Sequence, residues 1–187
     1  MVKKEIRVIG IDDGPFNKFM DNQVLVVGVV MRGGLYVDGV LSAKSKVDGN
    51  DATNKIIKMI NKCKFRPQLQ CIFLSGIAVA GFNIIDIKEL NKKTKIPVIV
   101  VIRKNPDIEN IKNTLIKINQ KNKIKFIENA GKVMQINDIF VQLAGINLEK
   151  ARKILKIACT RNLLPEPLRL AHIIAAGIVM GESKGRA

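Results

Sequence analysis

Residues 5–15 read EIRVIGIDDGP, and this stretch decides the fold. Its side chains alternate between two faces, with Ile6, Val8 and Gly10 on one face and Arg7, Ile9 and Ile11 on the other. Both faces are largely apolar, which is typical of a strand buried in the middle of a sheet. We therefore predict a central strand that ends at Asp12-Asp13 and turns at Gly14-Pro15.

Two more strands are predicted directly after this one. Residues 23–31 form an almost unbroken apolar run rich in valine, and Arg32-Gly33-Gly34 then supplies the positive φ values of a tight hairpin. Apolar and polar side chains alternate from residue 35 to residue 47, which indicates a strand with one solvated face. We expect this third strand at the edge of the sheet.

Helices and strands then alternate along the chain. After Asp48-Gly49-Asn50-Asp51 the apolar side chains recur at the spacing of one face of a helix. Further strands are predicted at 70–75 and 97–103, and short ones at 123–127 and 136–143. Helices are predicted at 84–95, after Asn105-Pro106, from Asn147 to 160 and from Pro165 to 181. Strands separated by helices pair in parallel. The prediction is one α/β domain over residues 1–187, with a mixed five-stranded sheet, antiparallel in its first three strands, and flanking helices.

The charge of the chain points to a polyanionic partner. Lys and Arg number 32 against 16 Asp and Glu, a formal net charge of +16, and nucleic acid is the partner that this charge favours. The alternative is a solvated surface set by genome composition or thermal adaptation. One Tyr, no Trp and seven Phe leave little aromatic surface for stacking single-stranded bases.

Other composition signals narrow the class of protein. No window approaches the roughly 18 apolar residues of a membrane span, and the basic start leads into no apolar leader segment, so we expect a soluble cytoplasmic protein with no membrane partner. Cys63, Cys71 and Cys159 lack CxxC spacing and are interpreted as small buried hydrophobes. No organic cofactor is expected, because no Walker motif, zinc spacing or Ser-His-Asp order is found.

Asp12 and Asp13 are the candidate catalytic residues. The first strand pairs on opposite sides with the second strand and with strand 70–75, and ligands favour the switch point where such carboxyl ends meet. Mg²⁺ or Mn²⁺ beside a substrate phosphate would need Asp12 together with carboxylates from other strands. Asp48, Asp51 and Asp86 are the candidates for these further ligands. The alternatives are a turn residue for Asp48 and a helix N-cap for Asp51.

Two other segments carry candidate binding groups. The connection after strand 70–75 contains Gly76, Gly81, Phe82 and Asn83, whose backbone N–H groups could receive a phosphate. Arg169 could form a bidentate pair with a carboxylate or a phosphate. We interpret Glu166 as a helix-start residue held in an internal ion pair, and His172, the only histidine, as an ordinary buried or surface residue.

Four stretches together resemble an archaeal family of unknown function over nearly the whole chain. They are residues 10–16 (GIDDGPF), 47–53 (VDGNDAT), 81–86 (GFNIID) and 181–187 (GESKGRA). That family is similar to endonuclease V, a ribonuclease H-like enzyme that cleaves a phosphodiester near deaminated purines using Mg²⁺. Residues 158–161 (ACTR) and 164–167 (LPEP) carry the likeness to endonuclease V.

The resemblance implies roles for several residues. Asp12 matches the first-strand metal-binding aspartate of endonuclease V, and Asp48 or Asp51 stands for its glutamate before the first helix. Its strand-four Asp-Gly is replaced here by Ser75-Gly76, and its strand-five lysine by Arg103. Its Gly-His-Arg is replaced by Leu143-Ala144-Gly145. The candidate substrate contacts are then Ser75, Gly76, Asn83, Arg103 and Arg169.

Losing a carboxylate removes negative charge from a site that must hold a divalent cation. The favoured hypothesis is an endonuclease V-like nucleic-acid-binding protein with a Mg²⁺-dependent phosphodiester-processing activity and a rebuilt site. The alternative is a catalytically inactive nucleic-acid-binding protein that retains only the fold. A third hypothesis, small-molecule phosphoryl chemistry, lacks the Gly-rich hairpin that would bind the phosphates.

Overall fold

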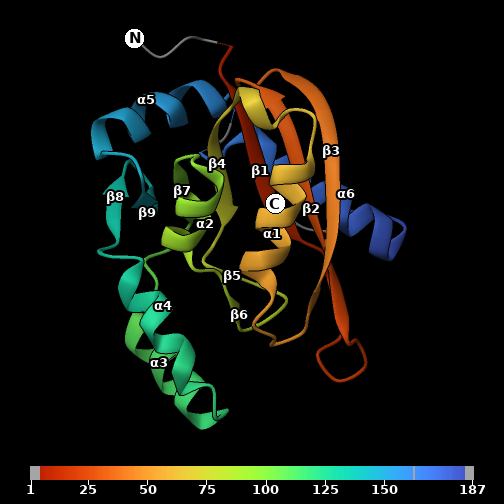
Figure 1. The fold of residues 1–187 in the computed structure, drawn as a ribbon, viewed down its shortest axis with the longest axis vertical. Coiled ribbons are helices and arrows are strands. Elements are labelled where there is room, and N and C mark those ends of the chain that lie inside the picture. Colours follow the sequence, from red (N-terminus) through yellow and green to blue (C-terminus); the bar gives the residue numbers. More distant parts are fainter. Residues whose placement is uncertain (1–4, 162, 184–187) are drawn as a thin grey trace.

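The fold is built on a mixed sheet. The computed structural model describes residues 5–161 and 163–183, and these residues form a seven-stranded sheet in the order β3-β2-β1-β4-β7-β9-β8 and a separate hairpin, β5-β6 (Figure 1). β1 (Arg7–Asp13) lies between β2 (Gln23–Arg32), its antiparallel neighbour, and β4 (Leu69–Ser75), its parallel neighbour. The predicted central strand and both its neighbours are confirmed.

The first three strands form the expected antiparallel meander. β3 (Tyr36–Lys46) pairs only with β2 and lies at the edge of the sheet, as the alternation of its side chains predicted. The turn between β2 and β3 contains Gly33 with φ of 57°, a backbone conformation that glycine adopts at little cost. Glycine at this turn therefore permits the tight connection.

The other half of the sheet corrects the predicted strand count. β7 (Val98–Ile102) is parallel to β4, whereas β9 (Ile139–Ala144) is antiparallel to β7 and pairs with β8 (Met134–Ile136). The single strand predicted at 136–143 is thus a hairpin that turns at Asn137, where φ is 52°. The prediction of a five-stranded sheet was wrong, because this hairpin extends the sheet to seven strands.

Three helical segments also differ from the prediction. Residues 123–127 form no strand but lie in η2 (Lys121–Lys123) and α4 (Ile124–Asn129), because Ile124 and Ile127 are spaced for one face of a helix. α3 (Ile108–Lys117) is capped by Asp107, whose side chain accepts from the Asn110 N–H, and not by Asn105-Pro106. α2 (Ile87–Thr94) begins late because β5 (Ala78–Val79) and β6 (Asn83–Ile84) come first.

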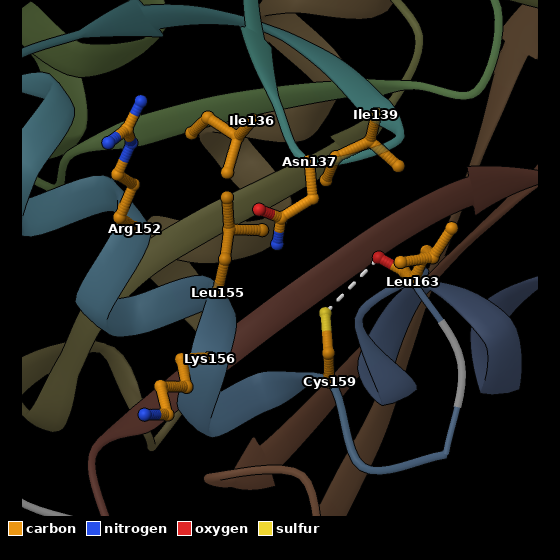
Figure 2. Close-up of a pocket in the computed structure, with 8 residues that line it drawn as sticks. All are labelled: Ile136, Asn137, Ile139, Arg152, Leu155, Lys156, Cys159 and Leu163. Atoms are coloured by element: carbon orange, nitrogen blue, oxygen red, sulfur yellow. Dashed lines mark hydrogen bonds between the residues drawn. The ribbon is translucent and has the colours of Figure 1, made fainter.

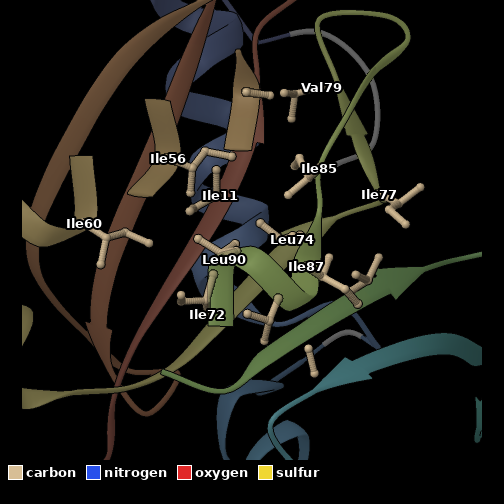
Figure 3. Packing of buried hydrophobic residues seen from close by; sticks show 14 of the residues in the cluster. Ile11, Ile56, Ile60, Ile72, Leu74, Ile77, Val79, Ile85, Ile87 and Leu90 are labelled. Atoms are coloured by element: carbon tan, nitrogen blue, oxygen red, sulfur yellow. The ribbon is translucent and has the colours of Figure 1, made fainter. Parts of the chain in front are cut away.

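Helices cover both faces of the sheet. α1 (Ala52–Lys62), followed by the short η1 (Arg66–Gln68), packs with α2 on one face, where Ile56, Ile60 and Leu90 meet Ile11 and Ile72 (Figure 3). α5 (Leu148–Ala158) and α6 (Glu166–Met180) pack on the other face against a cluster that includes Phe73. The predicted Asn147 cap of α5 is confirmed, and so are the opening of α6 at Pro165 and its end at Gly181.

α6 lies very close to β1 because of Gly10. A Cβ atom built on Gly10 would lie 2.4 Å from the backbone carbonyl carbon of Pro167, a distance that real Cβ atoms do not tolerate. Only a glycine in β1 therefore lets the start of α6 sit against the strand. This contact fixes where the later residues of α6 lie along β1.

Three remaining observations concern the chain as a whole. Within the described residues, no helix is both long and apolar enough to cross a membrane.

All three cysteines are free; Cys71 is buried, and Cys63 and Cys159 are partly buried. The last of the four family-like stretches, residues 181–187, lies partly outside the described residues, which end at 183.

Candidate active site at the carboxyl end of β1

The carboxyl ends of β1, β4 and β7 open into a cavity of about 670 Å³. Its lining includes Asp12 and Asp13 at the end of β1, Ser75 at the end of β4, Arg103 just after β7 and His172 on α6. The cavity therefore lies where the strand order predicted a ligand site.

Asp12 makes the key contact of this cavity. Residues 8, 10 and 12 of β1 face α6, and Oδ2 of Asp12 lies 3.0 Å from Nδ1 of His172. Its Oδ1 accepts a hydrogen bond of 3.0 Å from the Asp13 N–H. Asp12 is only 7% exposed, whereas the His172 side chain is 32% exposed. The pair is thus a buried carboxylate reached by an imidazole that remains open to the cavity.

His172 was not recognised as a site residue from the sequence. α6 buries Leu168, Ala171 and Ala175 against the sheet, and His172 follows directly on the flank of that apolar stripe. Its partner lies 160 positions earlier in the chain. The close approach of Gly10 to Pro167 fixes which residues of α6 lie beside the end of β1, and this packing is the signal that could have identified His172.

Burial changes the proton affinity of both aspartates. Desolvation and, to a smaller extent, the negative charge of Asp13 raise the pKa of Asp12 to about 6, against the opposing effects of His172 and of the Asp13 N–H. Desolvation also raises the pKa of Asp13, although the hydrogen bond from the Ala80 N–H opposes it. Two partly buried carboxylates side by side are unfavourable when both are ionised, and a bound cation would relieve that repulsion.

Asp13 and Asp48 hold the β5–β6 hairpin. Oδ2 of Asp13 accepts a hydrogen bond of 2.7 Å from the Ala80 N–H, and Oδ1 of Asp48 accepts one of 2.7 Å from the Phe82 N–H. The Asp48 N–H in turn donates to the Ala80 carbonyl at 2.9 Å. Two of the backbone N–H groups in the segment predicted to receive a phosphate therefore already bind carboxylates of the protein.

Asp51 and Asn83 belong to a separate polar cluster. Oδ1 of Asp51 accepts hydrogen bonds from Nδ2 of Asn83 and from Oγ of Ser45, both at 2.8 Å. Burial alone would raise the pKa of Asp51, but these hydrogen bonds hold it below its usual value. Oδ1 of Asn83 accepts from the Ala52 N–H, so this buried side chain joins α1 to the hairpin. Neither Asp51 nor Asn83 lines the cavity.

The predicted ligand set Asp12, Asp48 and Asp51 is therefore not brought together. Only Asp12 of the three lines the cavity. Among the described residues, no group of three or more His, Cys, Asp or Glu side chains is placed to hold a metal ion. Asp86, the other candidate, caps α2 by accepting from the Glu89 N–H at 2.9 Å. Asp48 and Asp51 are used to fold the loops around the site.

The predicted substrate contacts divide into two groups. Ser75, Gly76 and Arg103 line the cavity, and Arg103 is exposed at its rim. Arg169, in contrast, is bound to Glu166 by two contacts, at 2.9 Å from Nε and 2.8 Å from Nη2 to the same carboxylate oxygen. The internal ion pair inferred for Glu166 is thus confirmed.

A buried lysine was missed as well. Lys123 is 1% exposed, and its Nζ donates to the carbonyls of Asp48, Gly49 and Phe82 at 2.8, 2.7 and 2.6 Å. Burial lowers its pKa, and the nearby charge of Asp48 opposes that shift. A lysine among polar neighbours gives no sequence signal of burial, because lysine is almost always exposed.

A second cavity, of about 560 Å³, lies between the β8–β9 hairpin and α5 (Figure 2). Its floor is apolar, and Arg152 and Lys156 supply cations at its side. Sγ of Cys159 donates to the Leu163 carbonyl at 3.2 Å beside it. Among the described residues that line this cavity there is no carboxylate and no imidazole, unlike the cavity at Asp12.

The sheet order and the helices on both faces define an α/β protein with a ribonuclease H-like fold, and a carboxylate–histidine pair lies at the end of its first strand. The chain belongs to the Endonuclease dU family, whose model matches residues 4–179. The predicted relationship to an archaeal family similar to endonuclease V is thereby confirmed.

Relatives and solved structures agree with this assignment. A UPF0215 protein of Methanothermobacter thermautotrophicus is 46% identical over 191 residues, which cover 100% of this chain and 94% of that protein. The crystal structure of a protein of unknown function from Archaeoglobus fulgidus matches with a TM-score of 0.86 and 42% identity, covering 92% of this chain and 97% of the other.

A more distant match extends the likeness of the fold to an endonuclease V. Endonuclease V of Ciona intestinalis, solved with a DNA that contains an inosine followed by a ribo-adenosine, matches with a TM-score of 0.56 and 19% identity. The match covers 90% of this chain and 83% of the Ciona chain. At this identity the likeness concerns the fold.

Proposed function

We propose that this protein is a divalent-metal-dependent endonuclease that cleaves nucleic acid at deoxyuridine, the deaminated form of deoxycytidine. The observation that carries the proposal is the buried Asp12 in contact with His172 at the carboxyl end of β1, inside an open cavity with Arg103 at its rim. The formal charge of +16 supports a polyanionic substrate.

The donor set of the cavity fits a metal ion that is held only in part by the protein. Mg²⁺ is commonly bound by one or two carboxylates, with water and substrate phosphate completing its coordination. Asp12 and Asp13 would supply the carboxylates, and their raised pKa values are the mark of a site that lacks compensating positive charge. When bound there, the metal would supply electrophilic stabilisation of the phosphate and activation of water.

The side chains of the cavity have separable tasks in this proposal. His172 holds the carboxylate of Asp12 in one orientation through its contact of 3.0 Å. Arg103 at the rim and the Ser75 hydroxyl are placed to donate hydrogen bonds to a phosphate that enters the cavity. Asp13 keeps the β5–β6 hairpin beside the cavity through the Ala80 N–H.

The substrate class comes from the name of the family and from a neighbouring structure. The family is named for an endonuclease and for dU. The Ciona endonuclease V is bound to DNA with an inosine, which is also the product of a deamination. Both names therefore point to a deaminated base, and the name of this family points to deoxyuridine in particular.

The test is a cleavage assay with the full chain. Labelled duplex and single-stranded oligonucleotides would carry one deoxyuridine, one deoxyinosine or neither, with Mg²⁺, Mn²⁺ or EDTA. We expect a metal-dependent break close to deoxyuridine, and a rate at least about 100-fold lower for Asp12→Asn. Asp51→Asn is the matched control, because Asp51 lies outside the cavity. Cleavage that is equal in EDTA or equal in Asp12→Asn would refute the proposal.

A second candidate function is nucleic-acid binding without cleavage. It is favoured by Ser75, a neutral hydroxyl at the strand end where endonuclease V carries an aspartate, and by the use of Asp48 and Asp51 in loop folding. The same assay separates the two functions: salt-sensitive binding with no product in Mg²⁺ or Mn²⁺ would favour the non-catalytic protein.

A further inference from the structure

The loop between β1 and β2 exposes two large apolar side chains. Phe19 is 92% exposed and Met20 is 79% exposed, although such side chains are usually buried. Both lie at the tip of the loop, which projects beyond the sheet at the end of the molecule where β1 finishes (Figure 1). Apolar groups held out in water in this way require an explanation.

The tip is held in a defined conformation. The Asn17 N–H donates to Oδ2 of Asp21 at 2.7 Å, and the Phe19 N–H donates to Oδ1 of Asn17 at 2.9 Å. The Asp21 N–H closes the turn by donating to the Asn17 carbonyl at 2.9 Å. The two side chains are therefore presented by a hydrogen-bonded turn, which lowers the entropy lost when they contact a partner.

The base of the same loop is part of the candidate active site. The Gly14 N–H donates to the Leu25 carbonyl at 2.8 Å, and Phe16 lines the cavity with Gly14. A Cβ atom built on Gly81 would lie 3.6 Å from Cζ of Phe16, so this ring rests against the β5–β6 hairpin. Since Phe19 follows Asp13 by six positions, their Cα atoms can be no more than about 20 Å apart.

The charges around the tip select the partner. Lys18 is exposed next to Phe19, and Arg103 and Lys104 are exposed where β7 ends. A second copy of this chain would bring the same charge of +16 and be repelled. A nucleic acid, in contrast, has phosphates for these cations and stacked bases for the apolar tip.

We propose that Phe19 and Met20 form an apolar wedge that inserts between the bases of a nucleic-acid duplex held in the cavity at Asp12. This inference rests on the proposed function, because the cavity must first bind nucleic acid. Wedges of Phe, Leu, Ile or Met partly unstack a base step and kink the duplex, at a cost of a few kcal/mol per step. The wedge would expose the base beside the scissile bond, where a duplex otherwise hides it.

The test uses a DNA duplex with one deoxyuridine and 2-aminopurine at the neighbouring position, since stacking quenches the fluorescence of 2-aminopurine. All proteins carry Asp12→Asn so that the duplex stays intact. We expect binding to raise the fluorescence, and the added pair Phe19→Ala with Met20→Ala to abolish the rise and weaken duplex binding about tenfold. Phe19→Trp should keep both properties, because it retains an aromatic face.

Leu35 supplies a matched control. It is 87% exposed in the turn between β2 and β3, at the opposite end of the sheet, so Leu35→Ala removes a similar apolar group away from the cavity. We expect Leu35→Ala to leave fluorescence and affinity unchanged. A loss equal to that of the wedge variant would mean that exposed apolar surface acts nonspecifically, and would overturn the inference.

Two further outcomes separate the wedge from the proposed function. If the Phe19→Ala, Met20→Ala chain with Asp12 intact cleaves as well as wild type and the fluorescence rise persists, the wedge is wrong and the endonuclease stands. If the unsubstituted chain neither binds nor cleaves any duplex, the proposed function fails and the wedge fails with it. If these substitutions only dissolve a dimer seen by light scattering, the tip is a contact between copies and the wedge is again wrong.

Discussion

At the scale of single residues, the site depends on how β1 distributes two adjacent carboxylates. Asp12 faces α6 and contacts His172, whereas Asp13 turns to the β5–β6 hairpin and accepts from the Ala80 N–H. Side chains that follow one another in a strand start toward opposite faces, so Asp12 reaches α6 and Asp13 reaches the hairpin, while both line the same cavity. Asp13 therefore holds a loop and still places its charge close enough to raise the pKa of Asp12.

The raised pKa of Asp12 predicts a pH-dependent stability. In the unfolded chain this carboxyl ionises near 4, but in the folded protein it keeps its proton until about pH 6. The folded state therefore binds more protons between these values, and its stability falls as the pH rises through this window. Asp12→Asn should reduce the fall, of which the raised pKa of Asp13 keeps a part, and stabilise the metal-free protein at pH 7.5 by about 1–3 kcal/mol. Urea denaturation in EDTA at pH 4 and pH 7.5 measures the difference, and a variant that is less stable at pH 7.5 would contradict it.

Divalent cations should offset the loss of stability that ionised Asp12 causes at neutral pH. A cation bound at Asp12 and Asp13 stabilises their ionised forms, so the melting temperature at pH 7.5 should rise with Mg²⁺ or Mn²⁺ concentration. Asp12→Asn should abolish the rise. Asp51→Asn should keep it, because that carboxylate is engaged with Asn83 and Ser45 outside the cavity. An equal loss of response in both variants would mean that the cation binds elsewhere.

At the scale of secondary-structure elements, α6 contacts the site directly, and η2 supports it through the β5–β6 hairpin. α6 carries His172 to β1, and its approach depends on the absence of a side chain at Gly10. Lys123 in η2 joins the loop at Asp48 to the hairpin at Phe82 through three backbone carbonyls. Both contacts are made by elements that contain neither of the predicted catalytic residues, Asp12 and Asp13.

The Gly10 contact can be tested with a methyl group. In Gly10→Ala the new Cβ would meet the Pro167 backbone at 2.4 Å, so α6 must shift away from β1. We expect a loss of about 1–3 kcal/mol in stability from overpacking and a marked loss of cleavage, because His172 moves with the helix. Gly177→Ala is the matched control on α6, since nothing lies within 4 Å of its added Cβ. Chemical denaturation and the cleavage assay together would show whether packing and activity fall together.

Lys123 offers a second test at this scale. Lys123→Met keeps the apolar stem but removes the ammonium group that donates to three carbonyls, although the Asp48 carbonyl keeps Nε2 of Gln120 as a donor. Stability should therefore fall by about 3 kcal/mol. Lys125→Met, on an exposed position of α4, should change stability by less than about 0.5 kcal/mol. Hydrogen exchange should also become faster at the Phe82 N–H, which depends on Asp48. Equal stability of the two variants would show that water replaces the ammonium group.

The strands and helices that were predicted correctly are those whose apolar side chains repeat with the spacing of a strand or of a helix, but not of both. β1 to β3, the Asn147 cap and the limits of α6 were all predicted, because local alternation and capping signals agree with the tertiary environment. Residues 123–127 were assigned wrongly because their apolar spacing fits a strand and a helix alike. His172 and Lys123 were missed because their partners lie far away in the sequence, and no local pattern records such pairings.

At the scale of the whole molecule, the topology places some of the exposed cations at the end that holds the cavity. α3 and α4 project from the sheet at the end where β1 and β7 finish, on the other side from the β1–β2 loop (Figure 1). These two helices and η2 between them carry Lys117, Lys121 and Lys125 as exposed cations. The cavity thus lies between a lysine-rich helical projection and the apolar tip, an arrangement suited to a long polyanion.

This arrangement predicts where the salt dependence of binding originates. Each phosphate contact that is lost should lower the slope of log K against log salt by about 0.9 for a DNA duplex. Lys117→Gln with Lys121→Gln should therefore reduce the slope by up to about 2 and weaken binding at low salt. Lys58→Gln with Lys62→Gln removes the same charge from the far end of α1, and is expected to leave the slope unchanged. Fluorescence anisotropy at several salt concentrations measures both. Equal slopes for the two double variants would mean that the charge of +16 acts as a diffuse field rather than through the helices beside the cavity.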